Sequence, residues 1–241
     1  MFDRRQVLAG FGKTLGSAAL AAAFPTALRA APIKPDNVSA LVVIDVQNCF
    51  LPGGSLAVKD GEKVIPVINR IAKGFTNVVL TQDWHTPGHV SFASAHTGKK
   101  PFEMIDLSYG KQVLWPDHCV QGTEGASLSK SLAIPQAGLI IRKGFNKEVD
   151  SYSAFTEADG KTTTGLAAYL KARKIERLFL AGLATDFCVA WTALDARKAG
   201  FETYVVEDAC RGIDTRGSMN KAWGDMTEAG VKRIQSADIT V

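Results

Sequence analysis

The chain has 241 residues, of which 46% are hydrophobic and 22% are charged, and its formal net charge is +4. This composition excludes a disordered chain, and the length accommodates one large α/β domain or two small ones. The first 31 residues hold 4 of the 28 basic and 1 of the 24 acidic residues, which leaves 24 basic and 23 acidic residues in the rest. A domain with so small a net charge has no electrostatic attraction for nucleic acid or for an anionic membrane.

Residues 1–31 have the pattern of a targeting segment. Arg4 and Arg5 precede a run rich in alanine, glycine and leucine, and residues 28–31 are suited to cleavage. A twin arginine before a weakly apolar stretch is typical of a Tat export signal, whereas the glycines within the run make a membrane-anchoring helix a weak alternative. We therefore expect a periplasmic bacterial protein with one folded domain at 32–241. After signal removal it would have no stable membrane insertion.

The first buried strand is predicted at residues 40–44, a continuous apolar run that Asp45 follows. A carboxylate at the C-terminal end of such a strand lies where open parallel sheets bind their ligands. A turn-forming aspartate is the alternative. A helix is predicted over residues 60–73, with Asp60 as its N-cap.

A polar cluster follows the second predicted strand, at residues 77–80. Asp83 and His85 are two residues apart, so in extended chain their side chains point the same way. Aspartate and histidine together can hold a divalent ion with positions open for water or substrate. A solvated polar loop would account for the same residues.

A long loop without periodicity is predicted over residues 91–112. Loops of this length in a compact domain are usually functional or disordered. It leads to His118, the natural third metal ligand beside Asp83 and His85. His89 is a candidate fourth ligand, or a partner that orients one of the other three.

The rest of the chain alternates strands with helices. Strands are predicted at 138–142, 178–180, 203–206 and 231–234, and helices at 162–174, 185–198 and 217–229. This alternation predicts a three-layer α/β/α fold, a single domain with a doubly wound, mainly parallel six-stranded sheet. Asp45, Asp83, Lys143 and Cys188 then lie at strand C-termini, along one edge of the sheet.

Cys188 is placed in the first turn of the helix that Thr185 or Asp186 would cap. The helix dipole and free backbone N–H groups there favour the nucleophilic thiolate, although a cysteine packed under a helix is an equally ordinary explanation. The chain has four cysteines, and whether two of them pair is open: Cys49, Cys119, Cys188 and Cys210.

Seven motifs cover almost all of residues 36–241: VIDVQNCF at 43–50, TQDWH at 81–85, SFA at 91–93, LWPDHCVQ at 114–121, KG at 143–144, DSYSAF at 150–155 and GLATDFCV at 182–189. In this order they resemble the isochorismatase-like cysteine hydrolase superfamily. The two metal motifs, DWH and WPDHC, resemble its nicotinamidase (pyrazinamidase-like) branch.

The resemblance implies a catalytic triad of Asp45, Lys143 and Cys188. It further implies that the backbone N–H groups of Ala184 and Cys188 form an oxyanion hole, and that the Leu183–Ala184 peptide is cis. The implied reaction is hydrolysis of nicotinamide to nicotinate and ammonia through a thioester, a step of pyridine nucleotide biosynthesis and NAD salvage.

By the same resemblance, Asp83, His85 and His118 would hold one divalent ion, zinc, iron or manganese, which His89 also ligates in some relatives. Four aromatic residues match positions of the substrate pocket: Phe50, Trp115, Tyr152 and Phe155. An amidase acting on another small heteroaromatic or carbamoyl amide is the alternative within the superfamily. A non-catalytic metal-binding or interaction module is the alternative outside enzymes. The oligomeric state is open.

Overall fold

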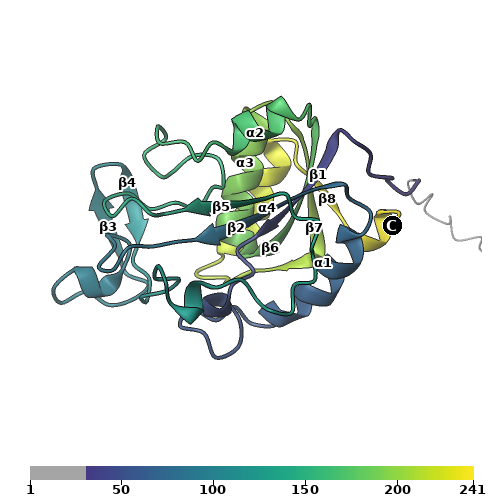
Figure 1. Cartoon of the computed structure of the whole chain (residues 1–241). Helices are drawn as coiled ribbons and strands as arrows, with labels where there is room; N and C mark the ends of the chain where they lie inside the picture. Colours follow the sequence, from purple (N-terminus) through teal and green to yellow (C-terminus); the bar gives the residue numbers. More distant parts are fainter. Residues whose placement is uncertain (1–30) are drawn as a thin grey trace, which may run out of the picture. The chain divides into compact units, whose positions relative to one another are not determined.

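The computed structural model describes residues 31–241, so the predicted export signal lies outside the described residues, apart from its last position. A sheet of six parallel strands forms the centre of this part of the chain (Figure 1), in the order β5-β2-β1-β6-β7-β8. The strands are β1 (Ser39–Ile44), β2 (Asn77–Asp83), β5 (Leu139–Lys143), β6 (Arg177–Leu183), β7 (Glu202–Arg211) and β8 (Lys232–Ile234).

The two faces of the sheet pack against different helices (Figure 1). On β1, Leu41 and Val43 face the core that contains α1 (Val64–Ala72). The alternate residues face the core under α2 (Leu166–Ala172), α3 (Ala190–Lys198) and α4 (Ser218–Glu228). A central strand apolar on both faces explains the continuous hydrophobic run in the sequence. The predicted three-layer, doubly wound fold is confirmed.

The strand order reverses between β1 and β6, because the chain builds one half of the sheet outward from β1 and the other half outward from β6. Open α/β sheets bind ligands outside the C-terminal ends of the strands at such a reversal. The residues after Ile44 and Leu183 meet at this point, since Ile44 pairs with Gly182 in the ladder.

The predicted loop at 91–112 instead contains part of a small antiparallel hairpin, β3 (Met104–Leu107) with β4 (Gly110–Val113). Four-residue strands are too short to show a period in the sequence. The helix predicted from residue 162 begins only at Leu166, because Thr163 still pairs with Thr156 in an isolated bridge.

Two predicted helix caps were wrong. Asp60 has a positive φ of 58° and makes no capping bond, and a short 3-10 turn follows it before α1. Neither Thr185 nor Asp186 caps the helix that carries Cys188, because Ala184 holds that position and the first turn is a π-turn, Thr185–Val189. Single-turn π segments occur most often at functional sites.

Cysteine pairing, which the sequence left open, is resolved for all four cysteines. Cys49 and Cys119 form a disulfide, while Cys188 and Cys210 are free and buried. Within residues 31–241, no helix combines the length and apolar content that a membrane span needs.

Candidate active site

Four strand ends place the polar residues of the site. Asp83 and Lys143 are the last residues of β2 and β5 and lie opposite each other in the parallel ladder. Asp45 follows β1 with a left-handed backbone (φ 48°), and the Thr81 hydroxyl accepts its N–H at 3.1 Å. Cys188 lies in the turn after β6. The prediction that these four residues lie along one edge of the sheet is therefore correct. The register of the strands adds that Asp83 and Lys143 are direct neighbours.

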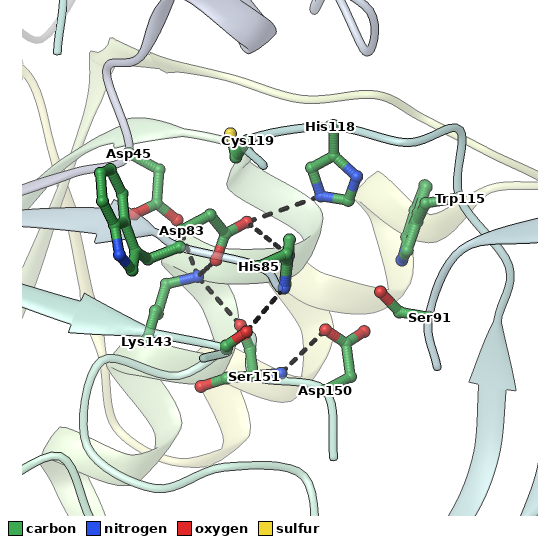
Figure 2. Close-up of polar contacts among 12 residues, drawn as sticks. Asp45, Asp83, His85, Ser91, Trp115, His118, Cys119, Lys143, Asp150 and Ser151 are labelled. Atoms are coloured by element: carbon green, nitrogen blue, oxygen red, sulfur yellow. Dashed lines mark hydrogen bonds and ion pairs between the residues drawn. The ribbon is translucent and has the colours of Figure 1, made fainter. Parts of the chain in front are cut away.

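The Lys143 ammonium lies at the centre of this cluster (Figure 2). Its Nζ lies 2.9 Å from Asp45 Oδ2 and donates to Asp83 Oδ1 and to the Ser151 carbonyl at 2.9 Å. It also donates to Cys188 Sγ at 3.4 Å. The Lys143 side chain is wholly buried. Burial opposes its charge, but the Asp45 and Asp83 carboxylates outweigh burial and hold the pKa of Lys143 well above its usual value.

Asp45 is a buried carboxyl group whose two oxygens have different partners. Its Oδ1 accepts the Thr81 hydroxyl at 2.5 Å, whereas Oδ2 forms an ion pair with Lys143 Nζ at 2.9 Å. Burial raises the pKa of Asp45 further than Lys143 lowers it. A carboxyl group with a raised pKa is suited to exchange a proton with a neighbour.

The Cys188 thiol is that neighbour. Its sulfur and the carboxylate oxygens of Asp45 and Asp83 all lie within 4.8 Å of one another. Burial raises the pKa of Cys188 well above its usual value despite Lys143, so burial opposes the thiolate that the helix terminus favours. Desolvation thus outweighs the helix terminus, and the thiol needs a base at the moment it attacks.

A group suited to a metal ion lies beside the cluster. One ligand atom each from Asp83, His85 and His118 lies within 4.8 Å of the other two, and all three residues are buried. Asp83 Oδ2 is 3.6 Å from His85 Nε2 and 3.7 Å from His118 Nε2. The Nδ1 atoms donate to the carbonyls of Gly144 and Pro116, at 2.9 and 2.8 Å. This leaves both Nε2 lone pairs facing Asp83, the arrangement usual for histidines that ligate metals.

His89 differs from His85 and His118. Its Nε2 lies 2.9 Å from the Asn146 carbonyl and its Nδ1 lies 2.8 Å from the Ser91 hydroxyl, so both ring nitrogens have partners in the protein. It also forms a second candidate group with His85 and Asp150. Burial and the neighbouring His85 lower the pKa of His89 to about 4, which leaves the ring neutral at pH 7.

A pocket opens between the triad and the metal group. Three of the predicted substrate residues line it, Phe50, Trp115 and Tyr152, together with Ala184 and Cys188. The fourth prediction, Phe155, does not match the pocket: Phe155 packs in the core under α2 and α3, with its ring 5.9 Å from that of Phe201.

Sequence reasoning missed several residues of the pocket. Phe187 and Ile213 line it, and the Phe187 ring lies 4.8 Å from the Trp115 ring. Phe187 directly precedes Cys188 and could have been recognised from that position, whereas nothing local to Ile213 indicates a site. Asp186 fixes Ile213 here by accepting its N–H at 3.0 Å.

Gln112 was missed as well, because it lay in the predicted loop. It is the buried residue of β4, and its Nε2 lies 2.7 Å from Asp150 Oδ2 and 3.1 Å from the Tyr152 hydroxyl. Trp115 Nε1 donates to the same hydroxyl at 3.0 Å. The hairpin therefore orients the tyrosine wall of the pocket.

Comparison with known proteins gives one consistent picture. The family description "Isochorismatase domain" matches residues 39–238. A nicotinamidase from Acinetobacter baylyi is 56% identical over 209 residues, 87% of this chain and 98% of the relative. A solved structure from Acinetobacter baumanii, described as a nicotinamidase and pyrazinamidase, superposes with a TM-score of 0.84 at 61% identity, covering 85% of this chain and 99% of that one. A zinc complex of a Pyrococcus horikoshii pyrazinamidase, at 35% identity and a TM-score of 0.67, covers 82% of this chain and 98% of its own.

Proposed function

The chain belongs to the isochorismatase family, and we propose that it hydrolyses nicotinamide to nicotinate and ammonia. The observation that carries this proposal is the buried contact of Lys143 with Asp45 and Cys188 at the wall of an aromatic pocket. The amide of nicotinamide is resonance-stabilised and ammonia is a poor leaving group, so a nucleophile and a proton donor are both needed.

The first half of the reaction forms a thioester. Asp45 takes the proton of the Cys188 thiol, and the sulfur attacks the carboxamide carbon while an electron pair moves to the oxygen. The backbone N–H groups of Ala184 and Cys188, which both line the pocket, donate to this oxyanion. Removing one such donor typically costs about 10²–10³-fold in rate. Asp45 then protonates the nitrogen, the C–N bond breaks, and ammonia leaves.

The second half releases nicotinate. Asp45, again a carboxylate, takes a proton from water, and the water oxygen attacks the thioester carbon. The carbon–sulfur bond then breaks, and the sulfur recovers the proton from Asp45. Lys143 stays charged throughout and balances the negative charge that moves between sulfur and carboxylate. One carboxyl group serves as base and acid in turn, which its raised pKa favours.

Asp83, His85 and His118 fit one divalent ion, because a buried carboxylate and two free imidazole nitrogens converge on one point. Zinc, iron and manganese all suit this donor set, and the Pyrococcus horikoshii relative is described as a complex with zinc. When bound, the ion supplies a Lewis-acidic position for the pyridine nitrogen of the substrate. The ring would lie among Phe50, Trp115 and Tyr152.

The N-terminal segment supports a proposed location. The twin arginine and the small residues at 28–31 favour Tat export to a bacterial periplasm, where the enzyme would turn external nicotinamide into nicotinate for NAD salvage. Cell fractionation tests this directly. Mature protein beginning near Ala31 in the periplasm is the expected result, and full-length protein confined to the cytoplasm would contradict it.

Ammonia release from metal-analysed protein tests the activity, with nicotinamide, pyrazinamide and a carbamoyl amide as substrates. Nicotinamide should have the highest kcat/KM, and preference for a carbamoyl amide would instead support another amidase of the superfamily. Cys188→Ala should lower kcat by roughly 10⁴-fold or more and keep its metal content. The matched control is Cys210→Ala, which replaces the other buried free cysteine. Metal-loaded wild type without turnover on any amide would favour a binding module.

A further inference from the structure

The disulfide links two segments that the proposed mechanism uses separately. Cys49 directly precedes Phe50 of the pocket, and Cys119 directly follows His118 of the metal group (Figure 2). The two cysteines are 70 residues apart in sequence, and their Cα atoms are 5.7 Å apart. Both are buried, and neither takes part in the chemistry of the triad.

The Cys49 side of the bond is firmly anchored. Its carbonyl accepts the N–H of Leu56 at 3.0 Å, and the neighbouring Asn48 donates its N–H to the Ser127 carbonyl at 3.0 Å. Cys49 itself is 1% exposed. Cys49 is therefore fixed in the core, and a disulfide bond to it restricts the movement of the segment that carries the other cysteine.

The Cys119 side contacts both histidines of the metal group. Cys119 is bonded in sequence to His118, and its carbonyl accepts the N–H of His85 at 3.1 Å. The Gln121 N–H in turn donates to the His85 carbonyl at 2.9 Å. Cys119 thus links the backbone segments that carry the two histidine ligands. Its φ of 45°, unusual for a residue other than glycine, is a conformation that needs such support.

We propose that the Cys49–Cys119 disulfide is a positioning element of the metal site, and that it makes the metal affinity of the protein redox-dependent. The inference rests on the proposed metal site of Asp83, His85 and His118. Without the bond, the segment that carries His118 has more freedom, so the ligands must be ordered when the ion binds. Loss of the groups that orient metal ligands typically costs 10–100-fold in affinity.

Reduction of this bond is chemically simple. A water-soluble phosphine attacks one sulfur, and hydrolysis of the phosphonium gives the phosphine oxide and two thiols, so the disulfide gains two electrons and two protons. Cys188 and Cys210 are already thiols and do not change. In cells, a dithiol protein would be the corresponding reductant and a disulfide oxidoreductase the oxidant.

The test compares zinc affinity in four samples of the mature protein: oxidised wild type, phosphine-reduced wild type freed of reductant under inert gas, Cys49→Ala and Cys210→Ala. Competition with a chromophoric chelator gives the apparent dissociation constant, and peptide mapping reports the bond. We expect reduced wild type and Cys49→Ala to bind zinc roughly tenfold more weakly than oxidised wild type. Cys210→Ala removes the same atoms from another buried cysteine and should match oxidised wild type.

Each other outcome counts against the inference. Equal zinc affinity in the oxidised and reduced wild type would overturn it while leaving the metal site and the amidase function intact. Absence of a Cys49–Cys119 cross-linked peptide from oxidised protein would overturn it directly. Failure of every sample to bind a divalent metal would overturn the metal site and this inference with it. Circular dichroism checks that Cys49→Ala is folded, and reduced wild type gives the same comparison without a substitution.

Discussion

The Nζ of Lys143 lies 3.4 Å from the Sγ of Cys188, and both side chains are buried where the sheet reverses its strand order. A buried ammonium is costly unless anions surround it. Here Asp45 and Asp83 do so, and the lysine links the nucleophile to its base and to the metal group. Catalysis and stability therefore depend on the same side chain.

Lys143→Met should lower both the catalytic rate and the stability of the protein. It leaves two buried carboxylates without their cation, a loss of about 3–5 kcal/mol in the free energy of unfolding at pH 7. Because the folded pKa of Lys143 is raised, its contribution is complete below the unfolded value near 10.5 and is lost only as pH rises through the higher folded value. The loss should shrink in acid, because the variant's buried carboxylates can then bind protons and lose their charge. In the wild type, Lys143 and His85 hold the pKa of Asp83 well below its usual value despite burial. Urea unfolding at pH 7 and pH 4 measures this, with exposed Lys161→Met as control; equal effects of the two changes would contradict it.

The sequence predicted those parts of the site that depend on local pattern. Asp45, Asp83 and Lys143 follow apolar runs, so their place at strand C-termini could be inferred without knowing the fold in detail. The order of the strands then brings them together. Cys188 was placed correctly after its strand, but the effect of burial on its pKa could not be inferred, because burial depends on residues from the whole chain.

Other features had no local signal. Gln112 lies on a strand too short to recognise, and its two partners are 38 and 40 residues further along the chain. Ile213 lines the pocket from a distant loop, where the Asp186 carboxylate accepts its backbone N–H. The pairing of Cys49 with Cys119 depends on a loop that returns to the first strand end, and the sequence offered no way to choose among the possible pairs.

The two kinds of histidine should respond differently to removal. His118→Ala takes one of three convergent ligands, so metal content should fall well below one ion per chain and nicotinamide KM should rise by roughly tenfold or more. His89→Ala should keep near-stoichiometric metal, because both ring nitrogens already have protein partners. Elemental analysis after dialysis measures both, and His96→Ala controls for loss of a loop imidazole. Full metal content in His118→Ala would exclude it as a ligand.

Gln112→Leu should weaken substrate binding more than the chemical step. The change leaves Asp150 Oδ2 without this donor and the Tyr152 hydroxyl with one partner fewer, so the tyrosine wall is less well held. We expect KM to rise about tenfold with kcat changed less, since a lost buried hydrogen bond costs about 1–2 kcal/mol. Steady-state kinetics with nicotinamide measures the split between KM and kcat. The control is Gln136→Leu, which replaces an exposed glutamine whose Nε2 donates to the Ala72 carbonyl. A fall in kcat alone would contradict this role.

Glu157 gives a pH-dependent prediction outside the catalytic group. It is 3% exposed, and no hydrogen bond from the described residues reaches either carboxylate oxygen. Burial raises the pKa of Glu157 from 4.5 to about 7. A raised folded pKa means that the folded state holds its proton more tightly, so this contribution to stability is complete below pH 4.5 and is lost as pH rises through 7.

Glu157→Gln should therefore stabilise the protein in alkali and not in acid. The neutral amide removes the cost of a buried charge, which amounts to about 3 kcal/mol at pH 9 for a shift of this size. Below pH 4.5 the acid is already neutral, and the gain should vanish. Thermal or urea unfolding at pH 4.5, 7 and 9 measures the difference, and Glu148→Gln, an exposed glutamate nearby, should change little at any of them. A constant difference across that range would mean that ionisation of Glu157 is not what the substitution removes.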